Sequence, residues 1–207
     1  MQLHRNIKQT LSVVLLTIIA SCALAQTAET HFNTGLAMID NRNYEGAVNE
    51  YSKAITLNPE YAEAYIKRGV SNIQLEDYTA AITDFNMALV LNPEVWEAWY
   101  YRANVHRKTG NYAKALNDYN KAIELNGSFA DAYFHRGISK YNLKDFAGAI
   151  SDYTKAIELK PSFHEAFYNR GLARYKSDDK KNACADLNKA KQLGNAYAAD
   201  FIAKYCK

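Results

Sequence analysis

The sequence predicts an all-α fold in which one pair of helices recurs five times. The first observation is a spacing: the only prolines, Pro59, Pro93 and Pro161, are separated by 34 and 68 residues, one and two units of a single period. The second is that small residues return at fixed positions of that period. The third is that three prolines and nine glycines in 207 residues leave little room for long linkers. Periods of about 20 to 50 residues are typical of solenoids and repeat arrays.

The 34-residue period defines five repeats, each predicted to fold as a helix, a turn and a second helix. They cover residues 28–61, 62–95, 96–129, 130–163 and 164–197. The eighth position is Gly or Ala in every repeat, and the 20th and 27th are always Ala, which allows two helices to approach closely. The 24th position holds a ring in the first four repeats, which predicts a core residue rather than a cofactor contact: Tyr51, Phe85, Tyr119 and Tyr153.

The sequence also indicates where the helices begin and end. An Asn or Asp followed by an aromatic residue sits between the two helices of the first four repeats, and its side chain suits an N-cap: Asn43, Asp77, Asn111 and Asp145. The pairs Asn58-Pro59 and Asn92-Pro93 end second helices, because a residue that precedes proline leaves the α region. Residues 198–207 resume a helical pattern and stop, so we expect a helix that caps the open end.

The first 25 residues differ from the rest. Arg5 and Lys8 precede an apolar run of about ten residues, and residues 23–25 (ALA) fit a cleavage site, which together are typical of a secretory signal. The run is shorter than the roughly 20 residues that span a membrane. Residues 19–22 (IASC) also resemble a bacterial lipobox, in which Cys22 would be lipidated. We favour cleavage after Ala25 and keep lipidation as the alternative.

Charge gives no sign of a nucleic-acid partner. Without Arg5 and Lys8 the 25 basic residues become 23 against 22 acidic ones, a net charge of +1. A chain with mixed signs and no basic field is not expected to bind nucleic acid, and a membrane contact is expected only if Cys22 is lipidated.

Two charged columns predict structural ion pairs. The seventh position is Arg and the 23rd is Asp in the last four repeats, and a buried arginine requires an acidic partner. The expected pairs are Arg68 with Asp84, Arg102 with Asp118, Arg136 with Asp152, and Arg170 with Asp186. An arginine ladder for phosphate would leave the Asp column unexplained.

No pattern indicates catalysis, a metal or another cofactor. HExxH, CxxC, Gly-rich phosphate loops and GxSxG are absent from the sequence. His106, His135 and His164 are evenly spaced by 29 residues, but each step drops five positions along neighbouring helices, about 7.5 Å. That distance is too long for the three histidines to share a metal ion. Because the sequence also contains no catalytic motif, neither an enzyme nor a small-molecule substrate is expected.

Cys184 and Cys206 are predicted to form a disulfide. Each lies eleven residues from Asn195, the centre of the connection between the last second helix and the cap. In an antiparallel hairpin with equal arms they reach the same axial level, and an exported chain enters a compartment where disulfides persist. Which way the two side chains face is left open by this argument, because a bridge needs Cα atoms within about 7 Å.

The recurring pattern, as in residues 64–93 (AYIKRGVSNIQLEDYTAAITDFNMALVLNP), resembles the tetratricopeptide repeat, and the resemblance covers residues 28–197. It implies a right-handed α-solenoid whose first helices line a concave groove with their fifth, ninth and twelfth positions. The groove residues that we then expect to bind a partner are Phe32, Ile66, Tyr100, Asn104, Arg107, Phe134, Tyr141, Tyr168 and Tyr175. Chaperone-binding members use Lys and Asn at the fifth and ninth positions of one repeat; here every fifth position is apolar or aromatic, which argues against that clamp.

The expected function is therefore binding of a protein or peptide segment in an apolar and aromatic groove, in the periplasm or outside the cell. The alternative is a lipid-anchored subunit of an envelope assembly complex, attached through Cys22.

Overall fold

The computed structural model describes residues 26–206, and the predicted signal and Cys22 lie outside this range. Residues 26–40 form the first helix. The helices that follow are α2 (Tyr44–Leu57), α3 (Ala62–Gln74), α4 (Tyr78–Leu91), α5 (Trp96–Lys108), α6 (Tyr112–Leu125), α7 (Ala130–Asn142), α8 (Phe146–Leu159), α9 (His164–Lys176), α10 (Lys180–Gln192) and α11 (Ala198–Tyr205). The described residues contain no strand. The predicted all-α series of helix–turn–helix repeats is therefore confirmed.

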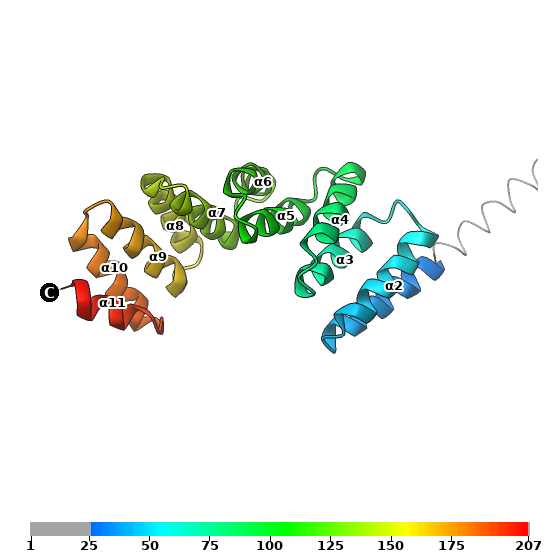
Figure 1. Cartoon of the computed structure of the whole chain (residues 1–207), viewed down its shortest axis with the longest axis horizontal. Coiled ribbons are helices and arrows are strands. Elements are labelled where there is room, and N and C mark those ends of the chain that lie inside the picture. Colours follow the sequence, from blue (N-terminus) through cyan, green and yellow to red (C-terminus); the bar gives the residue numbers. More distant parts are fainter. Residues whose placement is uncertain (1–25, 207) are drawn as a thin grey trace, which may run out of the picture. The chain divides into compact units, whose positions relative to one another are not determined.

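The chain divides into two compact units between Pro93 and Glu94. The first unit holds the helix over residues 26–40 with α2, α3 and α4, and the second holds α5 to α11 (Figure 1). In each unit, helices that are consecutive in the sequence pack on one another. In the second unit the first helices α5, α7 and α9 also contact in order. None of the helices in residues 26–206 is long and apolar enough to cross a membrane.

The core follows the predicted columns of small residues and rings. Alanines at the 20th and 27th positions of all five repeats are buried, as are the rings of Tyr51, Phe85, Tyr119 and Tyr153. A Cβ atom added at Gly137 would lie 2.7 Å from the Tyr153 ring, closer than real Cβ contacts come. Glycine at this position therefore allows the first helix of the repeat to pack closely against the Tyr153 ring of its partner helix.

The turns within repeats share a left-handed residue at their 15th position. Its φ is positive in every repeat: 57° at Arg42, 60° at Glu76, 78° at Gly110, 65° at Lys144 and 64° at Asp178. In the first repeat Arg42 N–H donates to Ile39 O and Asn43 N–H to Met38 O, the pairing that ends many helices. Only the third repeat uses glycine there, the residue for which this conformation costs least.

The side-chain caps agree with the sequence in three of four cases. Asn43, Asp77 and Asp145 accept hydrogen bonds from backbone N–H groups in the first turn of the next helix. The prediction for Asn111 is wrong, because its side chain makes no cap hydrogen bond. Its Nδ2 donates instead to Oγ1 of Thr109, 3.0 Å away.

Candidate functional site

The four predicted arginine–aspartate pairs form in the structure. In the pair of Arg136 and Asp152, Nε donates to Oδ2 at 2.9 Å and Nη2 donates to Oδ1 at 2.7 Å, so both carboxylate oxygens are held. The other three pairs have the same forked arrangement, with shortest N–O distances of 2.6 Å for Arg68–Asp84, 2.8 Å for Arg102–Asp118 and 2.7 Å for Arg170–Asp186. The aspartates are buried, and each arginine also lies over the aromatic ring at the fourth position of its own helix.

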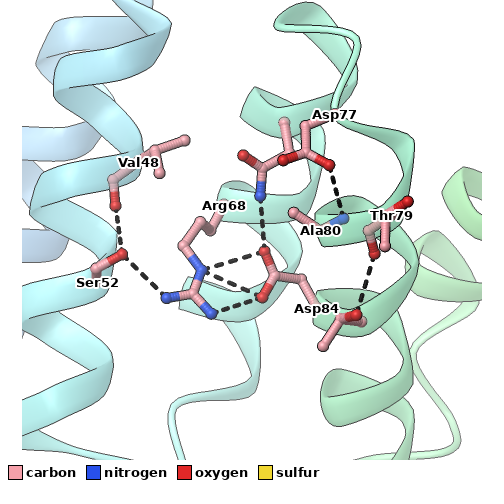
Figure 2. Close-up of a pocket in the computed structure, with 9 residues that line it drawn as sticks. Val48, Ser52, Arg68, Asp77, Thr79, Ala80 and Asp84 are labelled. Atoms are coloured by element: carbon pink, nitrogen blue, oxygen red, sulfur yellow. Dashed lines mark hydrogen bonds and ion pairs between the residues drawn. The ribbon is translucent and has the colours of Figure 1, made fainter.

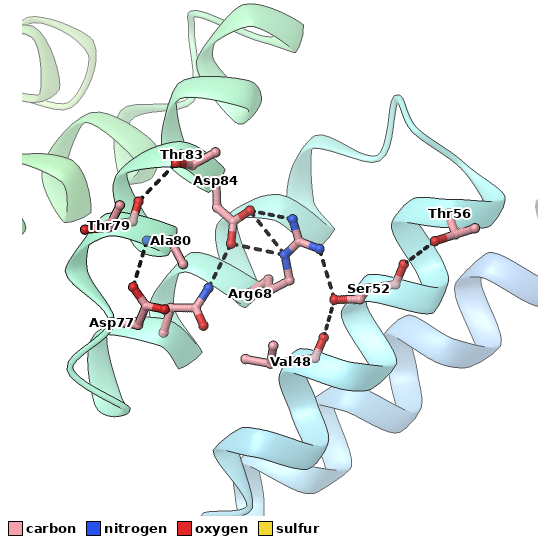
Figure 3. A network of polar contacts seen from close by, with 10 residues as sticks. Val48, Ser52, Thr56, Arg68, Asp77, Thr79, Ala80, Thr83 and Asp84 are labelled. Carbon is pink, nitrogen blue, oxygen red and sulfur yellow. Dashed lines mark hydrogen bonds and ion pairs between the residues drawn. The ribbon is translucent and has the colours of Figure 1, made fainter.

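Three of these arginines also link consecutive repeats, which the sequence did not lead us to expect. Arg68 Nη1 donates to Ser52 Oγ in the preceding repeat at 3.0 Å (Figure 3). Arg136 reaches Asn120 Oδ1 at 2.8 Å, and Arg170 reaches Thr154 Oγ1 at 3.0 Å. These acceptors all occupy the 25th position of a repeat. That column is small and polar in every repeat, which is the signal that could have revealed the link.

A hollow of about 600 Å³ in the first unit is lined by this network (Figure 2). Arg68 projects from α3 between Ser52 on α2 and Asp84 on α4. Asp84 accepts a further hydrogen bond from Asn72 Nδ2 at 3.1 Å, and Asp77 caps α4. Because these polar groups already satisfy one another, the hollow is better explained as a structural joint than as a ligand site.

The expectation that fifth-position side chains are open to a ligand is wrong for the first four repeats. Phe32, Ile66, Tyr100 and Phe134 are 5 to 9% exposed. In the first, third and fourth repeats the reason is an aromatic residue at the last position, which packs onto the fifth-position ring of the same repeat, whereas the second repeat has Ile66 and Val95 at these positions. The ring centroids are 4.9 Å apart for Phe32–Tyr61, 4.9 Å for Tyr100–Phe129 and 4.7 Å for Phe134–Phe163.

The last repeat has the same aromatic pair, but Tyr168 is half-buried and Tyr197 is exposed. Tyr168 and Tyr197 have centroids 6.4 Å apart, and Tyr197 is 73% exposed. A cleft of about 410 Å³ opens beside them, lined by Phe134, His164, Glu165, Tyr168, Asn169, Gly194, Asn195, Ala196 and Tyr197. A second hollow of about 290 Å³ shares Tyr168 and Tyr197 and continues toward α11. We call these two hollows the C-terminal cleft.

The floor of this cleft is held by polar contacts. Asn195 is buried, its Oδ1 accepts from the N–H of Tyr197 at 3.1 Å, and its Nδ2 lies 3.4 Å from Nδ1 of His164. His164 Nδ1 also lies 3.3 Å from a Glu165 carboxylate oxygen. Partial burial, followed by the negative charge of Asp200, raises the pKa of Tyr168, so its hydroxyl is neutral and able to donate.

The predicted groove residues at the ninth and twelfth positions make different contacts. Asn104 accepts a hydrogen bond from the Tyr119 hydroxyl at 2.6 Å, inside its own repeat. Tyr141 packs edge-on against Phe146, and Tyr175 contacts Phe201 and Tyr205 of α11, which covers it. The capping helix thus takes part of the surface that the sequence assigned to a partner. Arg107 has a separate environment, described below.

The cysteines have the positions that the predicted disulfide requires. The Cα atoms of Cys184 and Cys206 are 5.7 Å apart, and the sulfur atoms face each other at bonding distance. The two side chains therefore face each other, which the sequence left open. That the two thiols are oxidised to a disulfide stays a prediction. Within residues 26–206 no three His, Cys, Asp or Glu side chains are grouped so that they could hold a metal ion.

Comparisons with known proteins agree with this architecture. Models of the tetratricopeptide repeat match residues 62–95, 96–129, 130–163 and 165–193, and a model described as TPR repeat matches residues 35–75. A search of curated protein sequences found no match.

Solved structures of similar fold include a crystal structure of MamA protein, with 25% identity and a TM-score of 0.75 over 87% of this chain and 96% of that one. The structure of YrrB, described as a TPR protein with an unusual peptide-binding site, has 26% identity and a TM-score of 0.72 over 84% and 90% of the two chains. MamA residues 41 to the end from Desulfovibrio magneticus RS-1, at 22% identity, share the fold with a TM-score of 0.77 over 83% and 97%. The chain therefore belongs to the tetratricopeptide repeat proteins, and it is an interaction module rather than an enzyme.

Proposed function

We propose that this protein binds a peptide or protein segment, and that the C-terminal cleft is the principal contact. One observation carries the proposal: the aromatic pair that closes the joint between repeats elsewhere, as in Phe134–Phe163, leaves Tyr168 half-buried and Tyr197 exposed in the last repeat. Exposed aromatic side chains beside a cleft are the usual anchors of protein interfaces, because they bury a large area at low entropic cost.

The chemistry of the cleft favours a large apolar side chain with a polar neighbour. Its lining includes the rings of Tyr168 and Tyr197, the small exposed part of the otherwise buried Phe134, and the polar side chains of His164 and Glu165. The volume of about 410 Å³ suits one side chain and part of a backbone rather than a whole domain. YrrB, to which this chain is similar, is described as a peptide-binding protein, and that likeness supports the same class of ligand.

The test is a peptide selection followed by mutation. Random peptides displayed on phage are selected against the protein, and the affinity of the selected peptides is measured by fluorescence polarisation. Tyr168→Ala and Tyr197→Ala should each weaken binding about tenfold or more, the effect of removing an aromatic anchor. Tyr112→Ala, a half-buried tyrosine at the start of α6 and outside the cleft, is the matched control. Equal affinities for all three variants would assign binding to another surface.

We further propose that the protein acts outside the cytoplasm. The support is the composition of residues 1–25, with Arg5 and Lys8 before a short apolar run. Mass spectrometry of the mature N-terminus from an envelope fraction tests this proposal. A chain that begins at Gln26 indicates cleavage of a secretory signal, and a lipidated Cys22 indicates the anchored alternative. A chain that keeps Met1 in the cytoplasmic fraction contradicts export.

A further inference from the structure

Arg107 is a half-buried arginine in the second unit. Its surroundings differ from those of the other arginines of the first helices. It lies in the last turn of α5, and its Nε atom is buried without a hydrogen-bond partner. Its charge acts on groups of four helices, namely Tyr100 on α5, Tyr119 on α6, His135 on α7 and Tyr153 on α8, so these groups lie near it. Its side chain hydrogen bonds to Tyr119, a neutral partner.

No described carboxylate forms an ion pair with Arg107, although arginine–aspartate pairs recur throughout the described repeats. Arg102 on the same helix pairs with Asp118, and Arg170 and Arg174 on α9 share Asp186. Three acidic residues act on the cluster, Asp131 on Tyr100, Asp118 on Tyr119 and Asp152 on Tyr153, and the last two are paired with Arg102 and Arg136.

The groups around Arg107 do not compensate its charge. Burial raises the pKa of Tyr100 to about 12, so this hydroxyl stays neutral rather than becoming a phenolate. Burial, followed by the charge of Arg107 itself, lowers the pKa of His135 to about 3, so the imidazole is neutral at pH 7. The carbonyl ends of α5 offset the guanidinium charge only in part. A desolvated cation without an anion is unfavourable, and a ligand that supplies one relieves that cost.

The order of the first helices gives the distance between Arg107 and the C-terminal cleft. Arg107, Tyr141 and Tyr175 occupy the twelfth position of α5, α7 and α9, which pack in that order. Helices pack about 8–10 Å apart, so α9 lies two such steps from α5. Tyr168 is also seven residues nearer the start of its helix than the twelfth position, about 10 Å along the axis. The span is then roughly 22 Å, which six or seven residues of extended chain cover.

We propose that Arg107 receives a carboxylate of the bound peptide, six or seven residues away from the apolar side chain that occupies the C-terminal cleft. This inference rests on the proposed function and adds the charge and spacing of the ligand. The carboxylate can come from an acidic side chain or from the end of a chain, and both would pair with the guanidinium in the same way.

The first experiment isolates the anion site. Acetate and, as the uncharged control, acetamide are titrated into the ¹⁵N-labelled protein, and the Nε–Hε signal of Arg107 is followed by NMR. Acetate should shift this signal with saturation in the millimolar range, and acetamide should not. An unchanged signal with acetate overturns the inference, whether or not peptides bind at the cleft.

The second experiment tests charge and spacing together. Three labelled peptides are compared: Glu-(Gly-Ser)₃-Phe with a capped C-terminus, the same peptide with Gln in place of Glu, and Phe-(Ser-Gly)₃-Ala with a free C-terminal carboxylate. A carboxylate peptide should bind the wild type about tenfold or more tightly than the Gln peptide. Preference for the first or the third peptide identifies the source of the carboxylate.

Variants separate this inference from the proposed function. Arg107→Gln should remove the advantage of the carboxylate, and Lys108→Gln, which removes the same charge from an exposed neighbour, should keep it. Because Arg107 has no described acidic partner, Arg107→Gln should melt at or above the wild-type temperature. Tyr168→Ala should weaken all three peptides alike. If the carboxylate advantage persists in Arg107→Gln, or neither carboxylate peptide binds the wild type more tightly than the Gln peptide, the inference is wrong while the cleft still stands.

Discussion

Replacement of Asp118 by Ala should destabilise the third repeat strongly. The Asp118 side chain is 8% exposed and holds both Nε and Nη2 of Arg102 at 2.8 Å. Breaking a buried pair by removing one partner costs about 3–5 kcal/mol, because the remaining charge is left without compensation. The Arg102 side chain is 18% exposed and can recover some hydration, so we expect a value near the lower end, about 3 kcal/mol.

The assay follows from the position of the two tryptophans of the chain. Trp96 and Trp99 both lie on α5, and the Arg102 guanidinium lies 4.8 Å above the Trp99 ring, so tryptophan fluorescence reports on this repeat. With a urea dependence of about 1–3 kcal/mol per molar, the midpoint should fall by roughly 1–3 M. Lys121→Ala is the control, because the Lys121 side chain on α6 is 38% exposed and pairs with Glu124 at the surface. Equal and small shifts for both variants would mean that the arginine column is solvated, and the reasoning on structural ion pairs would be refuted.

Three further predictions rest on buried groups. Tyr100→Ala and Phe134→Ala should each lower the free energy of unfolding in urea by about 3–5 kcal/mol, since both rings are buried. A decrease below about 1 kcal/mol would mean that the two rings face the ligand instead of the core. Cys184 and Cys206 should give no free thiol when the denatured, unreduced protein is titrated, and a Cys184→Ser variant should lose roughly 3 kcal/mol; two thiols per chain would contradict the bridge. His135 has a pKa lowered from 6.5 to about 3 in the folded protein, so the unfolded chain binds the proton more tightly and stability falls as pH drops below 6.5. The contribution of His135 to the slope should approach about 1.4 kcal/mol per pH unit near pH 5 and be lost in His135→Gln, which keeps the contribution of His106, whose pKa burial also lowers; an unchanged slope in the variant would exclude His135.

Several features of the site could be predicted because they depend on composition along one helix pair. A small eighth-position residue, such as Gly137, implies a large partner such as Tyr153, and a seventh-position arginine implies an acid within reach, such as Asp152 for Arg136. Both statements need only the period and the cost of crowding or of an unpaired charge. The same local argument placed Cys206 beside Cys184, because both lie eleven residues from the centre of the turn at Asn195.

Repeat period, helix pairs, core columns and charge pairing were thus determined by the sequence alone. Only the tertiary structure decided which groove positions are open, because exposure depends on what the next element covers. Tyr100 and Tyr168 occupy the same position of their repeats. Tyr100 is buried under Phe129, and the following first helix, α7, completes that joint. Tyr168 meets Tyr197 where only the short α11 follows, so the joint stays open. Packing between repeats, which no single repeat encodes, therefore determined which of these aromatic pairs stays open.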